Sequence, residues 1–121
     1  MYFLNISNHP SSLWSDRQLT AAEEYGIIRD IPFPQVNPEM DEQYIERLAD
    51  SLCDRIYAEF GREKYVVHIM GEMSFTFAVV SRLNKEGIKC MVSTTERKSV
   101  DNTNGTKTVS FDFVRFRGYV I

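Results

Sequence analysis

The sequence predicts an α/β fold in which a mostly parallel sheet is covered by helices on both faces and continues into an antiparallel β-ribbon. Short apolar runs alternate with longer segments whose apolar residues recur at helical spacing, which is the pattern of βαβ units. The run at 65–70 is apolar except for His68, as expected for a central strand covered on both faces. After a turn at 101–105 the chain is rich in β-forming residues, which favours a two-stranded antiparallel ribbon.

The first predicted helix follows a strand at 2–6. Ser15 is a good N-cap residue, and Gln18 three positions later can return a hydrogen bond to the Ser15 backbone, which is a capping box. We expect this helix to run to about Tyr25, because Gly26 can adopt the left-handed conformation that ends helices.

A strand at 27–33 precedes the longest predicted helix. Asn37 can cap this helix with Pro38 at its first position, and Gly61 can end it. An apolar stripe at helical period predicts which face is buried. The stripe consists of Ile45, Leu48, Ala49, Leu52 and Ile56.

The second half contains one more predicted helix and the remaining strands. The helix at 74–86 is apolar nearly all round, so we expect it to be largely buried, and a strand follows at 88–95. The β-rich stretch at 106–119 includes an aromatic segment at 111–117. Its aromatic side chains can stack on bases, form sheet core or form an oligomer interface, and we favour the interface.

Length and composition indicate one soluble domain over residues 1–121, with 43% hydrophobic and 26% charged residues. The net charge of −3 argues against binding of duplex nucleic acid, which usually requires a basic face. Cys53 and Cys90 show neither metal-site nor disulfide spacing and are interpreted as reduced, buried thiols. No membrane-spanning run and no signal-peptide pattern is evident, so we expect a cytoplasmic protein with no membrane partner.

Polar clusters follow three of the predicted strands, at the point where each strand ends. Ligands of open α/β sheets bind at that edge, so the pattern predicts a polar, phosphate-bearing ligand. The candidate ligand-binding residues are Ser7, Asn8, Gly71, Glu72, Ser74, Thr94, Thr95 and Lys98. The candidate catalytic residues are His9 and Arg97.

Each cluster has a chemical reason to bind and a structural alternative. Glycine-rich phosphate motifs are absent, so Ser7 and Asn8 would supply donors and His9 would transfer a proton; alternatively they only satisfy turn amides. Gly71 permits close approach to a helix N-terminus, whereas Ser74 can simply cap that helix.

The third cluster combines hydroxyl groups with the cations of Arg97 and Lys98, which suits phosphate oxygens. The alternative is an exposed ribbon in which Thr and charged residues alternate. His68, inside a central strand, is interpreted as a hydrogen-bonded core histidine rather than a catalyst. No metal-ligand cluster or paired carboxylates stand out, so no metal and no cofactor is predicted.

Three segments together resemble a known group of proteins. Together with the strand and helix pattern, they resemble the small stand-alone CRISPR-associated proteins related to the CARF domain. The segments are Leu4-Asn-Ile-Ser-Asn-His-Pro10, Met70-Gly-Glu72 and Ser93-Thr-Thr-Glu-Arg97. That group includes ring nucleases. The resemblance implies a compact Rossmann-like three-layer sandwich and a homodimer that binds cyclic oligoadenylate or a related small nucleotide.

The resemblance also implies a reaction. Ring nucleases linearise the messenger of type III CRISPR defence without metal, through attack of a ribose 2′-hydroxyl on the adjacent phosphate. Such chemistry needs positioning and charge stabilisation, with His9 as general acid or base and Arg97 or Lys98 against phosphate charge. Two alternatives stay open: a sensor or sponge that binds without cutting, and a structural or adaptor protein.

Overall fold

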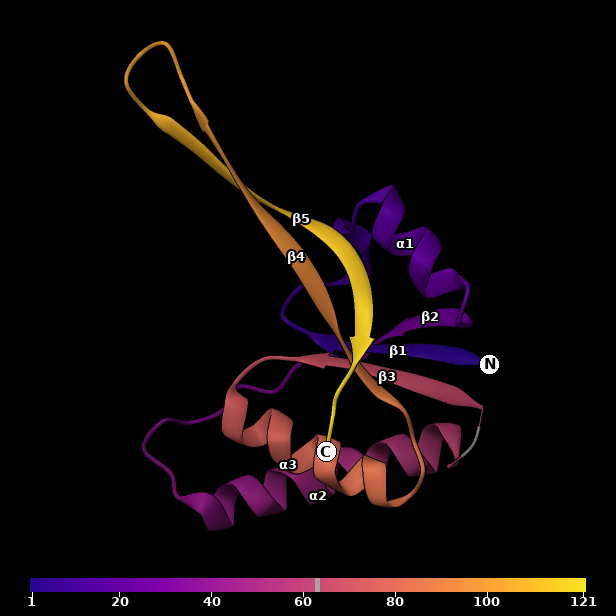
Figure 1. Cartoon of the computed structure of the whole chain (residues 1–121). Helices are drawn as coiled ribbons and strands as arrows, with labels where there is room; N and C mark the ends of the chain where they lie inside the picture. Colours follow the sequence, from indigo (N-terminus) through magenta and orange to yellow (C-terminus); the bar gives the residue numbers. More distant parts are fainter. Residues whose placement is uncertain (63) are drawn as a thin grey trace.

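Five strands form one mixed sheet in the computed structural model, which describes residues 1–62 and 64–121 (Figure 1). The strand order is β2-β1-β3-β4-β5, with β1 to β4 parallel and β5 antiparallel to β4. The strands are β1 (Tyr2–Ser7), β2 (Ile27–Asp30), β3 (Tyr65–Met70), β4 (Cys90–Asp101) and β5 (Lys107–Gly118). The predicted α/β class, with a mostly parallel sheet and a C-terminal antiparallel ribbon, is confirmed.

Helices cover both faces of this sheet (Figure 1). They are η1 (Ser11–Leu13), α1 (Asp16–Glu23), α2 (Glu42–Phe60) and α3 (Met73–Lys85). Because side chains alternate along a strand, β1 sends Phe3 towards the side of α1 and Leu4 towards α2 and α3. We call these the α1 face and the α2–α3 face. In β3, Val66 lies on the α1 face and Val67 on the α2–α3 face.

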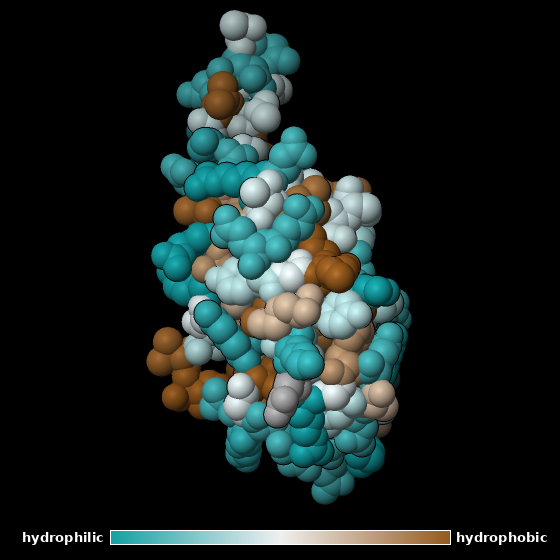
Figure 2. All heavy atoms as spheres, turned by 90° about the vertical axis from the view of Figure 1, so that its right-hand side faces the viewer, coloured by the Kyte–Doolittle hydropathy of each residue, from teal (hydrophilic) through white to brown (hydrophobic). Residues whose placement is uncertain are grey.

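The β4–β5 ribbon extends well beyond the other strands (Figure 1). Its turn is closed by a hydrogen bond from Asn102 N to Thr106 O, and Gly105 has a φ of 83°, which favours glycine. A register shift between Thr94 and Thr95 marks where the ribbon leaves the body. Its projecting end is mostly hydrophilic (Figure 2). The strand predicted at 88–95 therefore continues much further, to Asp101.

Two predicted element boundaries in the first half are wrong. The strand expected at 27–33 ends at Asp30. The last hydrogen bond to β1 runs from the next residue, Ile31 N, to Asn5 O. The long helix begins at Glu42 and is capped by Asp41, whose carboxylate accepts from Tyr44 N. Asn37, the predicted cap, instead closes a turn in which its side chain accepts from Glu39 N. The predicted apolar stripe does face the core, with Ala49, Leu52 and Ile56 buried.

Two expectations about apolar side chains need correction. The helix α3 is not buried all round, because Phe77 is 71% exposed and Met73 is 85% exposed. The aromatic segment at 111–117 was expected at an oligomer interface, but Phe113 and Phe116 belong to the core on the α1 face. They pack against one another with ring centroids 4.8 Å apart.

Candidate functional site

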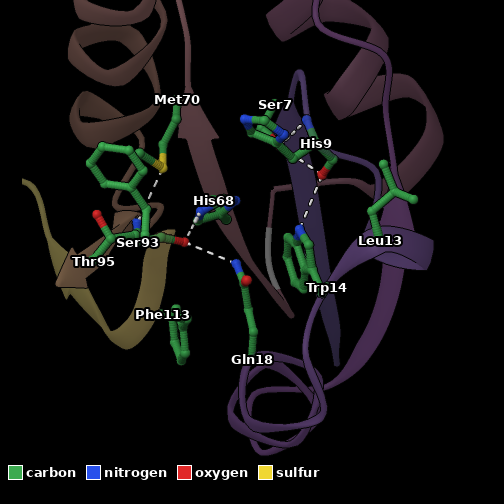
Figure 3. Close-up of a pocket in the computed structure, with 11 residues that line it drawn as sticks. Ser7, His9, Leu13, Trp14, Gln18, His68, Met70, Ser93, Thr95 and Phe113 are labelled. Atoms are coloured by element: carbon green, nitrogen blue, oxygen red, sulfur yellow. Dashed lines mark hydrogen bonds between the residues drawn. The ribbon is translucent and has the colours of Figure 1, made fainter. Parts of the chain in front are cut away.

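A continuous chain of hydrogen-bonded side chains crosses the α1 face of the sheet. Asn5 Nδ2 donates to Asp30 Oδ1 at 2.8 Å, and Asn5 Oδ1 lies 2.9 Å from His68 Nδ1. The other ring nitrogen, His68 Nε2, lies 2.7 Å from Ser93 Oγ. Ser93 Oγ also accepts a hydrogen bond of 3.2 Å from Gln18 Nε2 (Figure 3). Five side chains from β1, β2, β3, β4 and α1 thus form one network.

Strand register places these residues together. Asn5 pairs with His68 across β1 and β3, and both lie on the α1 face because their neighbours Leu4 and Val67 face α2 and α3. His68 pairs with Met91 of β4, so Ser93, two residues further, lies on the same face and one step closer to the carboxyl end of the sheet. The parallel alignment therefore stacks three polar side chains into one row.

The hydrogen-bond partners fix the direction of every proton in this row. The Asp30 carboxylate and the His9 carbonyl only accept, so the amide nitrogen of Asn5 faces them, at 2.8 and 3.0 Å. Asn5 Oδ1 therefore faces His68, and His68 Nδ1 must carry the hydrogen. His68 Nε2 is then the acceptor, and the Ser93 hydroxyl donates to it.

Burial keeps His68 uncharged. The side chain is 2% exposed and lies among the rings of Phe3, Trp14 and Phe116, and this burial lowers its pKa to about 4. Partial burial acts to raise the pKa of Asp30, but the hydrogen bonds from Asn5 and Ser11 outweigh it and the pKa is lowered. The row therefore joins a carboxylate at one end to a neutral imidazole near the other.

The row ends at a cavity of about 430 Å³, within the range of small-ligand sites (Figure 3). Ser93 and Gln18 lie in its wall together with side chains from β1, β3, β5 and the loop before α1. The full lining is Ser7, His9, Leu13, Trp14, Gln18, His68, Met70, Ser93, Thr95, Phe111 and Phe113. Hydroxyl, amide and imidazole groups thus meet aromatic rings at the carboxyl end of the parallel strands.

A second cavity of about 470 Å³ adjoins the first and adds charge. Leu13, Trp14, Gln18, Phe111 and Phe113 line both cavities. Arg17, Glu96 and Lys98 line only the second, where Lys98 Nζ lies 3.1 Å from Asp112 Oδ2. We call the two the aromatic cavity and the charged cavity.

Three of the residues predicted from sequence lie together in the aromatic cavity, namely Ser7, His9 and Thr95. Ser7 also belongs to the network, because its hydroxyl donates to Asn5 Oδ1 at 2.9 Å. Lys98 lines the charged cavity instead. The side chain of His9 is exposed, whereas its carbonyl accepts from Asn5 Nδ2 and Trp14 Nε1 and anchors the loop.

The other predicted residues lie elsewhere. Asn8 and Glu72 line a separate hollow beside residues 33–36, and Ser74 lines a groove between α2 and α3. Thr94 bonds to the backbone of Arg115, and Arg97 is exposed on the ribbon and lines neither cavity of the α1 face. The three polar clusters at the strand ends therefore do not line a single cavity: Ser7, His9 and Thr95 share one, and Asn8 and Glu72 share another.

Gly71 also has a structural reason to be glycine. The position lies against the ring of Phe33, and a Cβ there would collide with that ring. Phe33 in turn packs edge-on against Phe75, with ring centroids 5.3 Å apart. The space beside Gly71, which was expected to admit a ligand, is thus occupied by the ring of Phe33.

Glu72, rather than Ser74, caps α3. Its carboxylate accepts hydrogen bonds from Ser74 N and Phe75 N, and hydrogen bonds from Ser74 and Phe75 lower its pKa. We expect Glu72→Ala to lower the free energy of unfolding by about 1 kcal/mol, because two amides of the first turn lose their acceptor. Urea denaturation at neutral pH measures this, and Glu39→Ala, another exposed acidic residue, is the matched control. Equal stability of Glu72→Ala and the control would contradict the capping role.

Sequence reasoning missed the network itself. It placed His68 in the core as a hydrogen-bonded residue, which is confirmed; it did not single out Asn5 or Asp30, and it gave Gln18 only a capping role. The available signal was a polar residue inside each of two otherwise apolar strands, Asn5 and His68. A polar residue in a strand covered on both faces requires a buried partner, and the two are one another's partners.

Among residues 1–62 and 64–121, no group of three or more His, Cys, Asp or Glu side chains is placed to hold a metal ion. None of the helices in this described part has both the length and the apolar character needed to cross a membrane. Comparison with curated proteins and with solved structures gave no match. A family model described as "Uncharacterized protein MJ1673 family" matches residues 1–117, and the chain belongs to that family.

Proposed function

We propose that the protein binds a cyclic oligoadenylate or a related small nucleotide on the α1 face and opens the ring without a metal. The observation that carries the proposal is the junction of the aromatic and charged cavities. A nucleotide has an aromatic base and an anionic phosphate, so its base matches the aromatic cavity with Trp14 and Phe111. Its phosphate matches Arg17 and Lys98 of the charged cavity, where it would compete with Asp112 for Lys98.

The arrangement of layers supports a relationship to the CARF domain. Within residues 1–62 and 64–121, one α-helix on one face and two on the other, around parallel strands, fit a Rossmann-like three-layer sandwich. Such sheets bind ligands at the carboxyl ends of their strands. One aromatic cavity of about 430 Å³ has room for part of a ring of several nucleotides. We therefore propose that two copies of the chain, in the cytoplasm, share one ring across a two-fold axis.

In this proposal a ribose 2′-hydroxyl attacks the adjacent phosphate, the bond from phosphorus to the 5′-oxygen of the next nucleotide breaks, and the linear product carries a cyclic phosphate at one end and a 5′-hydroxyl at the other. The chain contributes positioning and proton transfer, and the exposed imidazole of His9, at the rim of the aromatic cavity, is the group we assign to proton transfer. The structural contacts of His9 run through its backbone. His9→Ala thus removes the imidazole and keeps the anchor of the loop.

The direct test incubates the purified protein with cyclic tri-, tetra- and hexaadenylate in the presence of EDTA. Calorimetry measures binding, and chromatography measures linear products. Linear products in the wild type that slow by about 100-fold in His9→Ala, at unchanged affinity, support the proposal. Binding without products indicates a sensor or sponge. No binding of any ring size overturns the proposal and leaves a structural role.

Lys98 provides a test of the phosphate contact. We expect Lys98→Ala to weaken nucleotide binding by about tenfold and to reduce the slope of log affinity against log salt by about 1, because one cation is lost from the charged cavity. Lys107→Ala removes the same charge far out on the ribbon, where Lys107 lies beside Asp101, and should leave affinity unchanged. Equal salt slopes in the two variants would exclude Lys98 from the phosphate site.

A further inference from the structure

We propose that Ser93 is an activated nucleophile that accepts the acyl group of an uncharged carboxylic ester, with His68 as its general base. Asn5 orients the imidazole, and Gln18 donates to the oxyanion that forms during attack. This activity does not depend on nucleotide binding. It follows from the row of side chains that ends at the aromatic cavity.

The distances are those of a nucleophile–base–orienter set. Ser93 Oγ lies 2.7 Å from His68 Nε2, and His68 Nδ1 lies 2.9 Å from Asn5 Oδ1. Both values fall within the 2.6–3.2 Å at which such sets operate, and an asparagine serves as orienter in papain-like Cys-His-Asn proteases. Asp30 holds the amide of Asn5 from the far side at 2.8 Å.

The direction of the hydrogen bonds suits catalysis. Since Nδ1 of His68 carries the hydrogen and donates to Asn5, the free lone pair of Nε2 faces the Ser93 hydroxyl. His68 is uncharged at neutral pH because burial lowers its pKa to about 4, so the imidazolium that forms as Ser93 attacks has to be stabilised by its contact with Asn5 Oδ1. Ser93 itself is only half-buried and lies in the cavity wall, where an electrophile can reach it.

Gln18 supplies the donor that the developing negative charge requires. Its Nε2 lies 3.2 Å from Ser93 Oγ, and a side-chain amide has a second N–H that can turn to an oxygen beside that position. A capping box at Ser15 would direct the Gln18 side chain back to the Ser15 backbone, but here only Gln18 N bonds to Ser15 Oγ. The Gln18 side chain is thus free to reach Ser93 in β4.

The reaction balances with groups present on the α1 face. Ser93 Oγ bonds to the carbonyl carbon as its proton moves to His68 Nε2, and the resulting oxyanion accepts from Gln18. The C–O bond to the alcohol then breaks, and the alkoxide takes the proton from His68. Water attacks the acyl-serine with His68 again as base, and this releases the carboxylic acid and restores the Ser93 hydroxyl.

The lining of the aromatic cavity sets the class of substrate. Among the described residues that line it there is no Lys, Arg, Asp or Glu, whereas Trp14, Phe111 and Phe113 provide aromatic surface. An uncharged ester with an apolar acyl or alcohol group fits such a wall. An anionic ester would have to lose its hydration there without a cation to replace it.

The first test treats the wild-type protein with a fluorophosphonate probe and locates the adduct by peptide mass spectrometry. We expect one adduct, on Ser93, with a rate about 100-fold lower in His68→Gln and unchanged in Ser110→Ala, an exposed serine on the ribbon. Hydrolysis of p-nitrophenyl acetate should follow the same order. An unlabelled wild type, an adduct elsewhere, or equal labelling of a folded His68→Gln would overturn the proposal.

A second test keeps the histidine in place. The Ser93→Cys variant should react with iodoacetamide at neutral pH at least tenfold faster than a free thiol, because neutral His68 accepts the thiol proton as the sulfur attacks. Cys53 and Cys90 are internal controls, since burial raises the pKa of these free thiols to about 11 and about 12. Adding Asn5→Ala to a protein that stays folded should remove this rate advantage. An ordinary thiol at position 93 would contradict activation by His68.

Discussion

Acidification from pH 7 to pH 4 is expected to lower the free energy of unfolding by about 3 kcal/mol through His68 alone. Burial lowers the pKa of His68 to about 4 in the folded protein, from an ordinary value of 6.5. The unfolded chain therefore binds a proton on His68 below pH 6.5, whereas the folded chain does not until about pH 4. Stability thus falls as pH falls through this window, and His68 has no effect on the slope above it.

The comparison that isolates this effect is urea denaturation of wild type and His68→Asn at pH 7 and pH 4. The variant keeps His9, the other histidine, and also Asp30, so the contributions of these two groups are common to both proteins and cancel in the comparison. At pH 7 the variant should be less stable by about 1–3 kcal/mol, because Asn5 and Ser93 lose a buried partner. It should then lose less stability than wild type on acidification. Equal losses would show that His68 is not buried as the structure has it.

The order of the elements could be predicted from sequence because each signal was local. Ser15 caps its helix as predicted by accepting from Gln18 N, although the Gln18 side chain does not return the bond, and Gly61 and Gly87 end their helices with positive φ. The errors came where two local signals competed. Asn37 and Asp41 can each cap a helix, and the choice of Asp41 depends on contacts made after folding, including the turn that Asn37 closes.

The network could not be predicted because register is not local. Asn5 and His68 are 63 positions apart and meet only because β1 and β3 align with Tyr2 opposite Tyr65. A shift of one residue would place Asn5 opposite an apolar residue and turn the polar row away from α1. The polar clusters at the strand ends were visible in the sequence. The hydrogen bond between Ser93, in one of these clusters, and His68 was not, because it depends on how β4 aligns with β3.

Removal of the Phe3 side chain is expected to be the most destabilising single truncation on the α1 face. Phe3 is fully buried, and its ring centroid lies 5.0 Å from that of Phe116, 5.8 Å from His68 and 6.0 Å from Trp14. Phe3→Ala should lower the free energy of unfolding by about 3–5 kcal/mol, because the cavity left behind is walled by sheet and cannot collapse. Urea denaturation at pH 7 measures the change.

Phe111→Ala is the matched control, since it removes the same atoms from a ring that is 64% exposed. Its free energy of unfolding should stay within about 0.5 kcal/mol of wild type. Phe111 nevertheless lines both cavities, so the same variant should weaken ligand binding, by about 1–3 kcal/mol if a base stacks on it. Phe3 thus stabilises the packing on the α1 face, whereas Phe111 is expected to contact the ligand. An equal loss of unfolding free energy in Phe3→Ala and Phe111→Ala would mean that Phe111 packs against the body of the protein more closely than its 64% exposure indicates.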